Sequence, residues 1–199
     1  MLRGKILGIP VAVSGYSVML AVFLLWRDRS QTVVWGFLAA GMHELGHIWM
    51  IRRLKCEGCE VRLTLCGLRI LRRDYGYQRE VWINLAGGAV NLCAAIGSGL
   101  LLLWVPAEGL AKFFWAQILM GGLNLLPIYP LDGGQALFDW LCGRMEVSRA
   151  ERIVNWVAFC ILFPLATGAM VLVFQSRGNI SLLGMVGTAI ILLVLKEKH

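Results

Sequence analysis

The feature that most constrains this chain is a short polar motif inside an apolar run of membrane-spanning length. The motif is His43-Glu44-Leu45-Gly46-His47, and the run extends from Gln31 to Ile51. Residues four apart in a helix stand on one face, roughly 5–6 Å apart, so the two imidazoles can bind one Zn²⁺. Glu44 is then placed to act on a metal-bound water. Ionisable groups in such a run are unfavourable unless they are paired or functional, which favours a metal site over chance placement in a buried helix.

The composition indicates a membrane protein rather than a soluble domain. Of the 199 residues, 58% are hydrophobic and 16% are charged. The apolar residues come in blocks of about 20, the length that crosses a bilayer as a helix. The net charge of +7 is also typical of nucleic-acid binders, but the basic residues cluster between the apolar blocks, as orientation signals do. We expect one membrane domain over residues 1–199, with the lipid bilayer and no nucleic acid among its partners.

The apolar blocks predict an all-α polytopic membrane protein with six transmembrane helices. The first block is too long for the apolar region of a signal peptide, and no small-residue cleavage site follows it, so we interpret it as a retained span. Pro164 predicts a kink in the fifth span. A short interfacial helix is expected over residues 135–142. The predicted spans are about 6–26, 31–51, 80–105, 110–128, 153–174 and 180–195.

The segment between the second and third spans alternates apolar and polar residues on both sides of Gly67. This period of two predicts a short β-hairpin at the membrane surface, with an ordinary amphipathic loop as the alternative. The same segment contains Cys56, Cys59 and Cys66. The C-x-x-C spacing suits a metal or redox pair, but only one further thiol accompanies it, so we favour reduced cysteines over a separate zinc knuckle.

The distribution of basic residues predicts the orientation of the six spans. Of the 19 Lys and Arg residues, all but Arg27, Arg29, Lys112 and Arg177 fall on the side that contains both termini and the second and fourth loops. Basic residues are enriched in cytoplasmic loops. We therefore expect a multi-pass protein of the cell membrane with both termini in the cytoplasm.

A catalytic zinc site normally has three protein ligands, and Asp132 is the best candidate for the third. It follows Pro127 and Pro130 at the end of the fourth span. The prolines leave backbone groups without helical hydrogen bonds, and inside a membrane such groups are tolerated only beside protein or water. The alternative is that Asp132 caps the helix that begins after it. The second and fourth spans both run towards the cytoplasm, so both parts of the site reach the cytoplasmic half of the membrane.

Together these residues resemble the site-2 proteases, a family of intramembrane zinc metalloproteases. The resemblance covers roughly residues 30–135, and the six-span layout is similar to the bacterial sporulation-type branch. We expect no appended nucleotide-sensing or PDZ domain. The matching patterns are His43-Glu44-Leu45-Gly46-His47, Gly87-x-x-x-Asn91 and Asn124-x-x-Pro127-x-x-Pro130-x-Asp132-Gly133.

The resemblance implies one Zn²⁺ per chain, bound by His43, His47 and Asp132. It also implies that Glu44 activates the attacking water and that Asn124 helps to hold the substrate. The implied reaction is hydrolysis of peptide bonds in transmembrane or membrane-associated proteins near the cytoplasmic side.

Three other interpretations of the motif remain open from the residues. A membrane zincin of another type would take its third ligand from a Glu on a later helix, and the fifth and sixth spans contain no interior acid. A metal transporter would need polar groups along a path, whereas here they converge on one point. A catalytically inactive zinc-binding chaperone would not need the four key residues to be intact.

Overall fold

Helices dominate the part of the chain that the structure, a computed structural model, describes. The described residues are 2–6, 9–13, 22–28, 32–56, 60–64, 67–71 and 76–175. They divide into two compact units, Met1–Leu125 and Leu126–His199.

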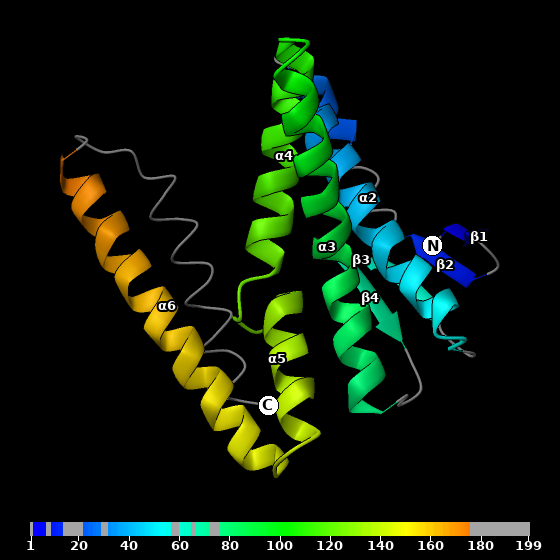
Figure 1. The fold of residues 1–199 in the computed structure, drawn as a ribbon, viewed down its shortest axis with the longest axis vertical. Helices are drawn as coiled ribbons and strands as arrows, with labels where there is room; N and C mark the ends of the chain where they lie inside the picture. Colours follow the sequence, from blue (N-terminus) through cyan, green and yellow to red (C-terminus); the bar gives the residue numbers. More distant parts are fainter. Residues whose placement is uncertain are drawn as a thin grey trace. The chain divides into compact units, whose positions relative to one another are not determined.

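The first unit contains three long helices that run beside one another (Figure 1). They are α2 (Thr32–Arg53), α3 (Tyr77–Leu102) and α4 (Glu108–Asn124). Charged residues stabilise both ends of α2. Arg52 and Arg53 occupy its last turn, where cations complement the helix dipole. At the start of α2, the carboxylate of Asp28 accepts a hydrogen bond of 2.6 Å from the backbone N–H of Val33.

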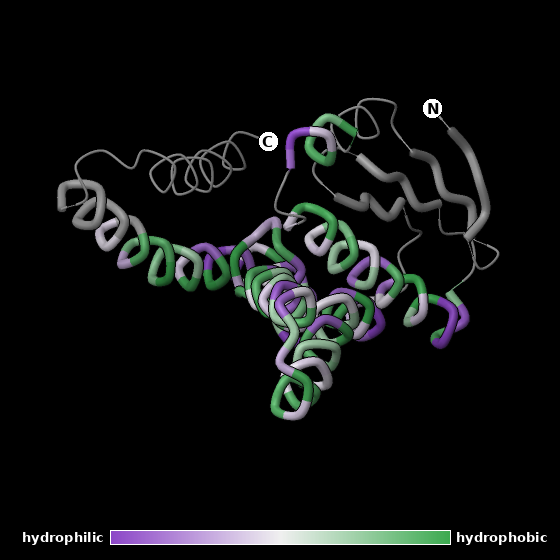
Figure 2. Tube along the Cα trace, turned by 90° about the horizontal axis from the view of Figure 1, so that it is seen from above, coloured by the Kyte–Doolittle hydropathy of each residue, from purple (hydrophilic) through white to green (hydrophobic). Residues whose placement is uncertain are grey.

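The interior of this bundle contains small and polar residues beside a few large apolar ones, of which Ile51 and Ile83 are fully buried. Ala39, Ala86 and Ala95 are buried, and so are the side chains of Asn84 and Asn91. Many other large apolar residues lie on the outside, where Trp82, Ile96 and Leu100 of α3 are each at least 60% exposed. Figure 2 shows hydrophobic residues recurring along these helices. Such an arrangement fits helices that pack through small residues while lipid covers their outer faces.

A small four-stranded sheet accompanies the helices in the first unit. The strands are β1 (Leu2–Ile6), β2 (Ile9–Val13), β3 (Glu60–Thr64) and β4 (Gly67–Leu71), in the order β1-β2-β3-β4. β1 pairs antiparallel with β2, and β2 pairs parallel with β3. β3 and β4 pair antiparallel at the place where the alternating pattern predicted a hairpin.

The strand β2 corrects the prediction of a membrane helix that begins at Ile6. Residues 9–13 are extended, and a helix is described only from residue 22 to residue 27. The misassignment arises because hydropathy alone does not distinguish a strand from a helix in a short apolar run. The β-branched residues Ile9, Val11 and Val13 fit a pleated strand better than a helix.

The structure supports some of the other predicted spans and does not describe all of them. Among the described residues, one helix combines the length and the hydropathy needed to cross a membrane, Tyr77–Leu102. The predicted sixth span, 180–195, lies outside the described residues.

The second unit contains α5 (Asp132–Cys142), the predicted short helix, and α6 (Val147–Gln175), which contains Pro164. The two helices pack through a cluster formed by Leu141, Cys142, Ala150 and Val154. This contact fixes the C-terminal part of α5, and Asp132 stands at its other end.

Candidate metal centre

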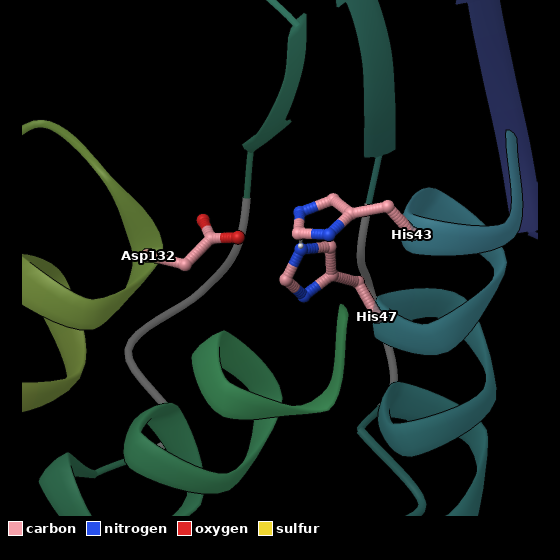
Figure 3. A group of neighbouring side chains, drawn as sticks. All are labelled: His43, His47 and Asp132. Carbon is pink, nitrogen blue, oxygen red and sulfur yellow. Dashed lines mark hydrogen bonds between the residues drawn. The ribbon is translucent and has the colours of Figure 1, made fainter. Parts of the chain in front are cut away.

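The two histidines of the motif lie on adjacent turns of α2 and point to the same side of the helix (Figure 3). His43 and His47 are only 4% and 5% exposed. Their Nε2 atoms are 3.1 Å apart, and the ring planes stand nearly perpendicular, at 84°. The four-residue spacing therefore produces the convergence that the sequence predicted.

The ring of His47 is held by the backbone of α3. Its Nδ1 lies 2.7 Å from the carbonyl oxygen of Ile83. A carbonyl oxygen only accepts hydrogen bonds, so Nδ1 must carry the proton. The Nε2 atom of neutral His47 therefore presents a lone pair.

The ring of His43 is held by a side chain of α3, that of Asn91. Its Nδ1 lies 3.2 Å from Oδ1 of Asn91, which is fully buried. Asn91 also donates from Nδ2 to the carbonyl oxygen of Ala39, at 3.1 Å. Asn91 thus connects the metal-binding motif to the turn of α2 that precedes it.

α3 passes so close to the histidines that only a glycine fits at the crossing. A Cβ placed on Gly87 would lie 2.5 Å from Nε2 of His47 and 2.8 Å from Nε2 of His43. On the other side of the contact, a Cβ on Gly46 would lie 2.8 Å from the carbonyl oxygen of Ala86. The paired glycines let α2 and α3 approach closely, as small residues do in membrane helices.

Glu44 follows His43 directly and is partly buried. One residue along a helix is a turn of about 100°, so its carboxylate leaves α2 on a different side from the imidazoles. This is the arrangement in which the motif's Glu acts on water while the two histidines bind the metal.

Asp132 is the first residue of α5, and the position that caps this helix belongs to Leu131. The alternative in which Asp132 serves as the helix cap is therefore not the observed one. Among the residues that the structure describes, His43, His47 and Asp132 form a group that could hold one metal ion, each offering a ligand atom within 4.8 Å of the others (Figure 3). Two imidazole nitrogens and one carboxylate oxygen are a donor set found in catalytic zinc sites.

Asn124, the remaining predicted site residue, is the last residue of α4 and is partly buried. Its Nδ2 donates to the carbonyl oxygen of Met120, one turn earlier in the same helix, at 3.0 Å. Its predicted contact with substrate remains a prediction.

Sequence reasoning did not assign roles to Gly87, Asn91 and the carbonyl of Ile83 at the metal centre. The available signal was the Gly87-x-x-x-Asn91 spacing, which puts both residues on one face of α3. That spacing shows that the two residues share a face, but not that the face is turned towards the histidines.

Comparison with solved structures identifies the fold of this chain. The structure matches that titled "Site-2 Protease from Methanocaldococcus jannaschii" with a TM-score of 0.63 and 22% identity, covering 94% of this chain and 91% of the other. This chain has the site-2 protease fold. The model of peptidase family M50 matches residues 107–165, a range that includes Asn124 and Asp132.

Two curated relatives match the chain by sequence. Zinc metalloprotease MJ0392 of Methanocaldococcus jannaschii is 25% identical over 86% of this chain and 56% of its own length. Stage IV sporulation protein FB of Bacillus subtilis is 25% identical over 77% of this chain and 56% of its own length. The chain thus spans little more than half the length of these relatives. The resemblance to site-2 proteases drawn from the motifs is confirmed.

Proposed function

We propose that this chain is a zinc metalloprotease that hydrolyses peptide bonds of transmembrane or membrane-associated proteins. The observation that carries the proposal is the buried histidine pair, whose Nε2 atoms lie 3.1 Å apart while each Nδ1 faces an acceptor. Two nitrogen lone pairs at this distance repel each other unless a cation lies between them. Two nitrogens bound to one tetrahedral Zn²⁺ at roughly 2.0–2.1 Å would be about 3.3 Å apart, close to the observed separation.

The proposed ligands are His43, His47 and Asp132, for one Zn²⁺ per chain. The donor types support Zn²⁺ over Ca²⁺ or Mg²⁺, which prefer an all-oxygen environment. A site with three protein ligands also keeps a fourth position open, as hydrolytic zinc sites do.

The proposed reaction is hydrolysis with Glu44 as general base and general acid. When bound, the zinc ion lowers the pKa of a water towards 7 and polarises the scissile carbonyl. Glu44 accepts a proton from the attacking water and later delivers it to the leaving amine. His43 and His47 act as neutral ligands, each with a hydrogen-bond acceptor beside its Nδ1 atom. Asn124 is proposed to hold the substrate beside the reacting carbonyl.

The proposed setting is a cell membrane crossed six times by a single domain, with both termini in the cytoplasm and the active site near the cytoplasmic side. Large apolar residues exposed on the helices support burial in lipid, among them Trp82 and Trp115, each 60% exposed. The asymmetric distribution of Lys and Arg supports the orientation.

The test compares two variants of neighbouring residues. Glu44→Gln should retain zinc but lower cleavage by roughly 10²–10⁴-fold, because Gln matches Glu in shape but cannot accept the proton. His43→Ala should lose zinc and cleavage together, because it removes a ligand. A substrate is first found by comparing membrane proteomes of cells that make the intact chain or the Glu44→Gln form. Metal content and cleavage are then measured on the same purified samples.

Each outcome bears on a different part of the proposal. Cleavage by Glu44→Gln at a near wild-type rate would contradict the general-base role. Loss of zinc from Glu44→Gln would make Glu44 a ligand. Zinc binding without any cleavage by the intact chain would favour a metal transporter or an inactive zinc-binding protein.

A further inference from the structure

Asn91 is a fully buried amide that contacts α2 through both of its polar atoms. We propose that Asn91 is a positioning residue of the metal centre: its carbonyl oxygen holds the proton of His43 on Nδ1 and so keeps the Nε2 lone pair available to zinc. The inference rests on the proposed zinc site and names the residue outside the ligand set that prepares it.

The orientation of the Asn91 amide follows from its two contacts. An amide's oxygen and nitrogen look alike in shape, so their assignment depends on the partners. The carbonyl oxygen of Ala39 can only accept, so the NH₂ group of Asn91 must face it, at 3.1 Å. Oδ1 then faces Nδ1 of His43, at 3.2 Å, and it can only accept. The contact with Ala39 therefore fixes which tautomer of His43 is favoured.

The two histidines differ in how their tautomers are set. His47 depends on the backbone carbonyl of Ile83, which a side-chain substitution at that position leaves in place. His43 depends on a side chain, Asn91. A single substitution on α3 can therefore disturb one ligand and leave the other as it is.

The proposal competes with a purely structural role for the same residue. Asn91 could matter only because its NH₂ group ties α3 to Ala39, as an interhelical hydrogen bond. The two roles use different atoms of the amide. Aspartate keeps the acceptor towards His43 and lacks the NH₂ group, whereas leucine, of similar size, lacks both. The two substitutions therefore separate the roles.

The experiment measures Zn²⁺ affinity by competition with a chelating dye, on full-length purified protein. Asn91→Leu should lower the affinity by about 10–100-fold, the usual effect of removing a partner of a ligating histidine. Asn91→Asp should stay within a few-fold of wild type, because a carboxylate is also an effective partner for a metal-bound imidazole. Ser98→Ala is the matched control: Ser98 is buried on the same helix, and among the described residues its hydroxyl bonds only to the carbonyls of Ala94 and Ala95. It should leave zinc affinity unchanged.

A second measurement needs neither zinc nor a folded Asn91→Leu variant. The chain has three histidines, so NMR of histidine-labelled protein can assign the tautomer of each ring. Zinc-free wild type should show His43 protonated on Nδ1, and Asn91→Asp should keep this state.

The outcomes distinguish this inference from the proposed function. Unchanged affinity in Asn91→Leu, or equal losses in Asn91→Leu and Asn91→Asp, would overturn the positioning role while leaving the zinc site in place. Wild-type protein that binds no zinc would overturn the proposed function. In that case the tautomer measurement still decides whether Asn91 holds the His43 proton, and a His43 ring protonated on Nε2 would refute the inference.

Discussion

The helix α2 has two neighbours in its bundle, and it meets them in different ways. Against α3 it places both histidines, with directed contacts to Asn91 and to the carbonyl of Ile83. Against α4 it places Trp35, whose ring lies 5.8 Å from that of Phe113. The described hydrogen bond on that side joins the Gln117 amide to the sulfur of Met42, at 3.1 Å, which is a weak acceptor.

The two contacts differ in how closely they constrain the histidine rings. On the α3 side, two hydrogen-bond acceptors and the close approach at Gly87 define the position of each imidazole. Small changes in α3 should therefore alter zinc binding. On the α4 side, an aromatic pair and a thioether contact are adaptable, and Oε1 of Gln117 is buried without a hydrogen-bond partner among the described residues. We infer that α3 shapes the metal centre and that α4 supports α2 by packing.

The largest effect is expected at Gly87, on the α3 side. Gly87→Ala places a methyl group 2.5 Å from Nε2 of His47, where it must displace the ring or separate the helices. Zinc stoichiometry should fall from one per chain towards zero, measured by metal analysis of the purified protein. The matched control is Gly97→Ala on the same helix, where a Cβ would meet nothing within 4 Å.

Gly97→Ala should bind zinc normally and leave stability unchanged or raised by up to about 1 kcal/mol, because Ala favours helix over Gly. Full zinc occupancy in Gly87→Ala would contradict this difference between the two helices, since it would mean that the α3 side is as adaptable as the α4 side.

The smallest effect is expected at Gln117, on the α4 side. Gln117→Leu removes a buried amide that has an unsatisfied oxygen and replaces it with an apolar group of similar size. Such a replacement is nearly neutral or stabilising, so the free energy of unfolding should change by no more than about 1 kcal/mol. Zinc affinity should match wild type in the dye competition. A tenfold loss of affinity would show that the α4 side also positions the ligands.

The sequence predicted the local part of the site well. The four-residue spacing of His43 and His47 is sufficient to put two imidazoles on one face of any helix, whatever surrounds it. The spacing of Gly87 and Asn91 likewise puts both residues on one face of the third span. The partner of Asn91 could not be predicted, because it depends on how α3 is rotated about its axis against α2. No local pattern in either helix specifies that rotation.

The N-terminal segment was predicted least well. Ile9–Val13 is apolar enough to belong to a membrane helix, and it pairs instead with strands on both sides, one of them about 50 residues away in the sequence. The parallel pairing of β2 with β3 is a long-range contact, and long-range contacts are not encoded in the periodicity of a short run. Hydropathy therefore showed that the segment is apolar but not which structure it adopts.

The most direct test of the zinc centre is X-ray absorption at the zinc edge of the purified protein. The proposed site predicts one zinc per chain with only nitrogen and oxygen neighbours at roughly 2.0–2.1 Å, two of them imidazoles, and loss of this signal in His43→Ala. Sulfur neighbours at roughly 2.3 Å would place the metal on cysteines instead. That result, or an unchanged spectrum in His43→Ala, would contradict a zinc site built on the histidines of α2.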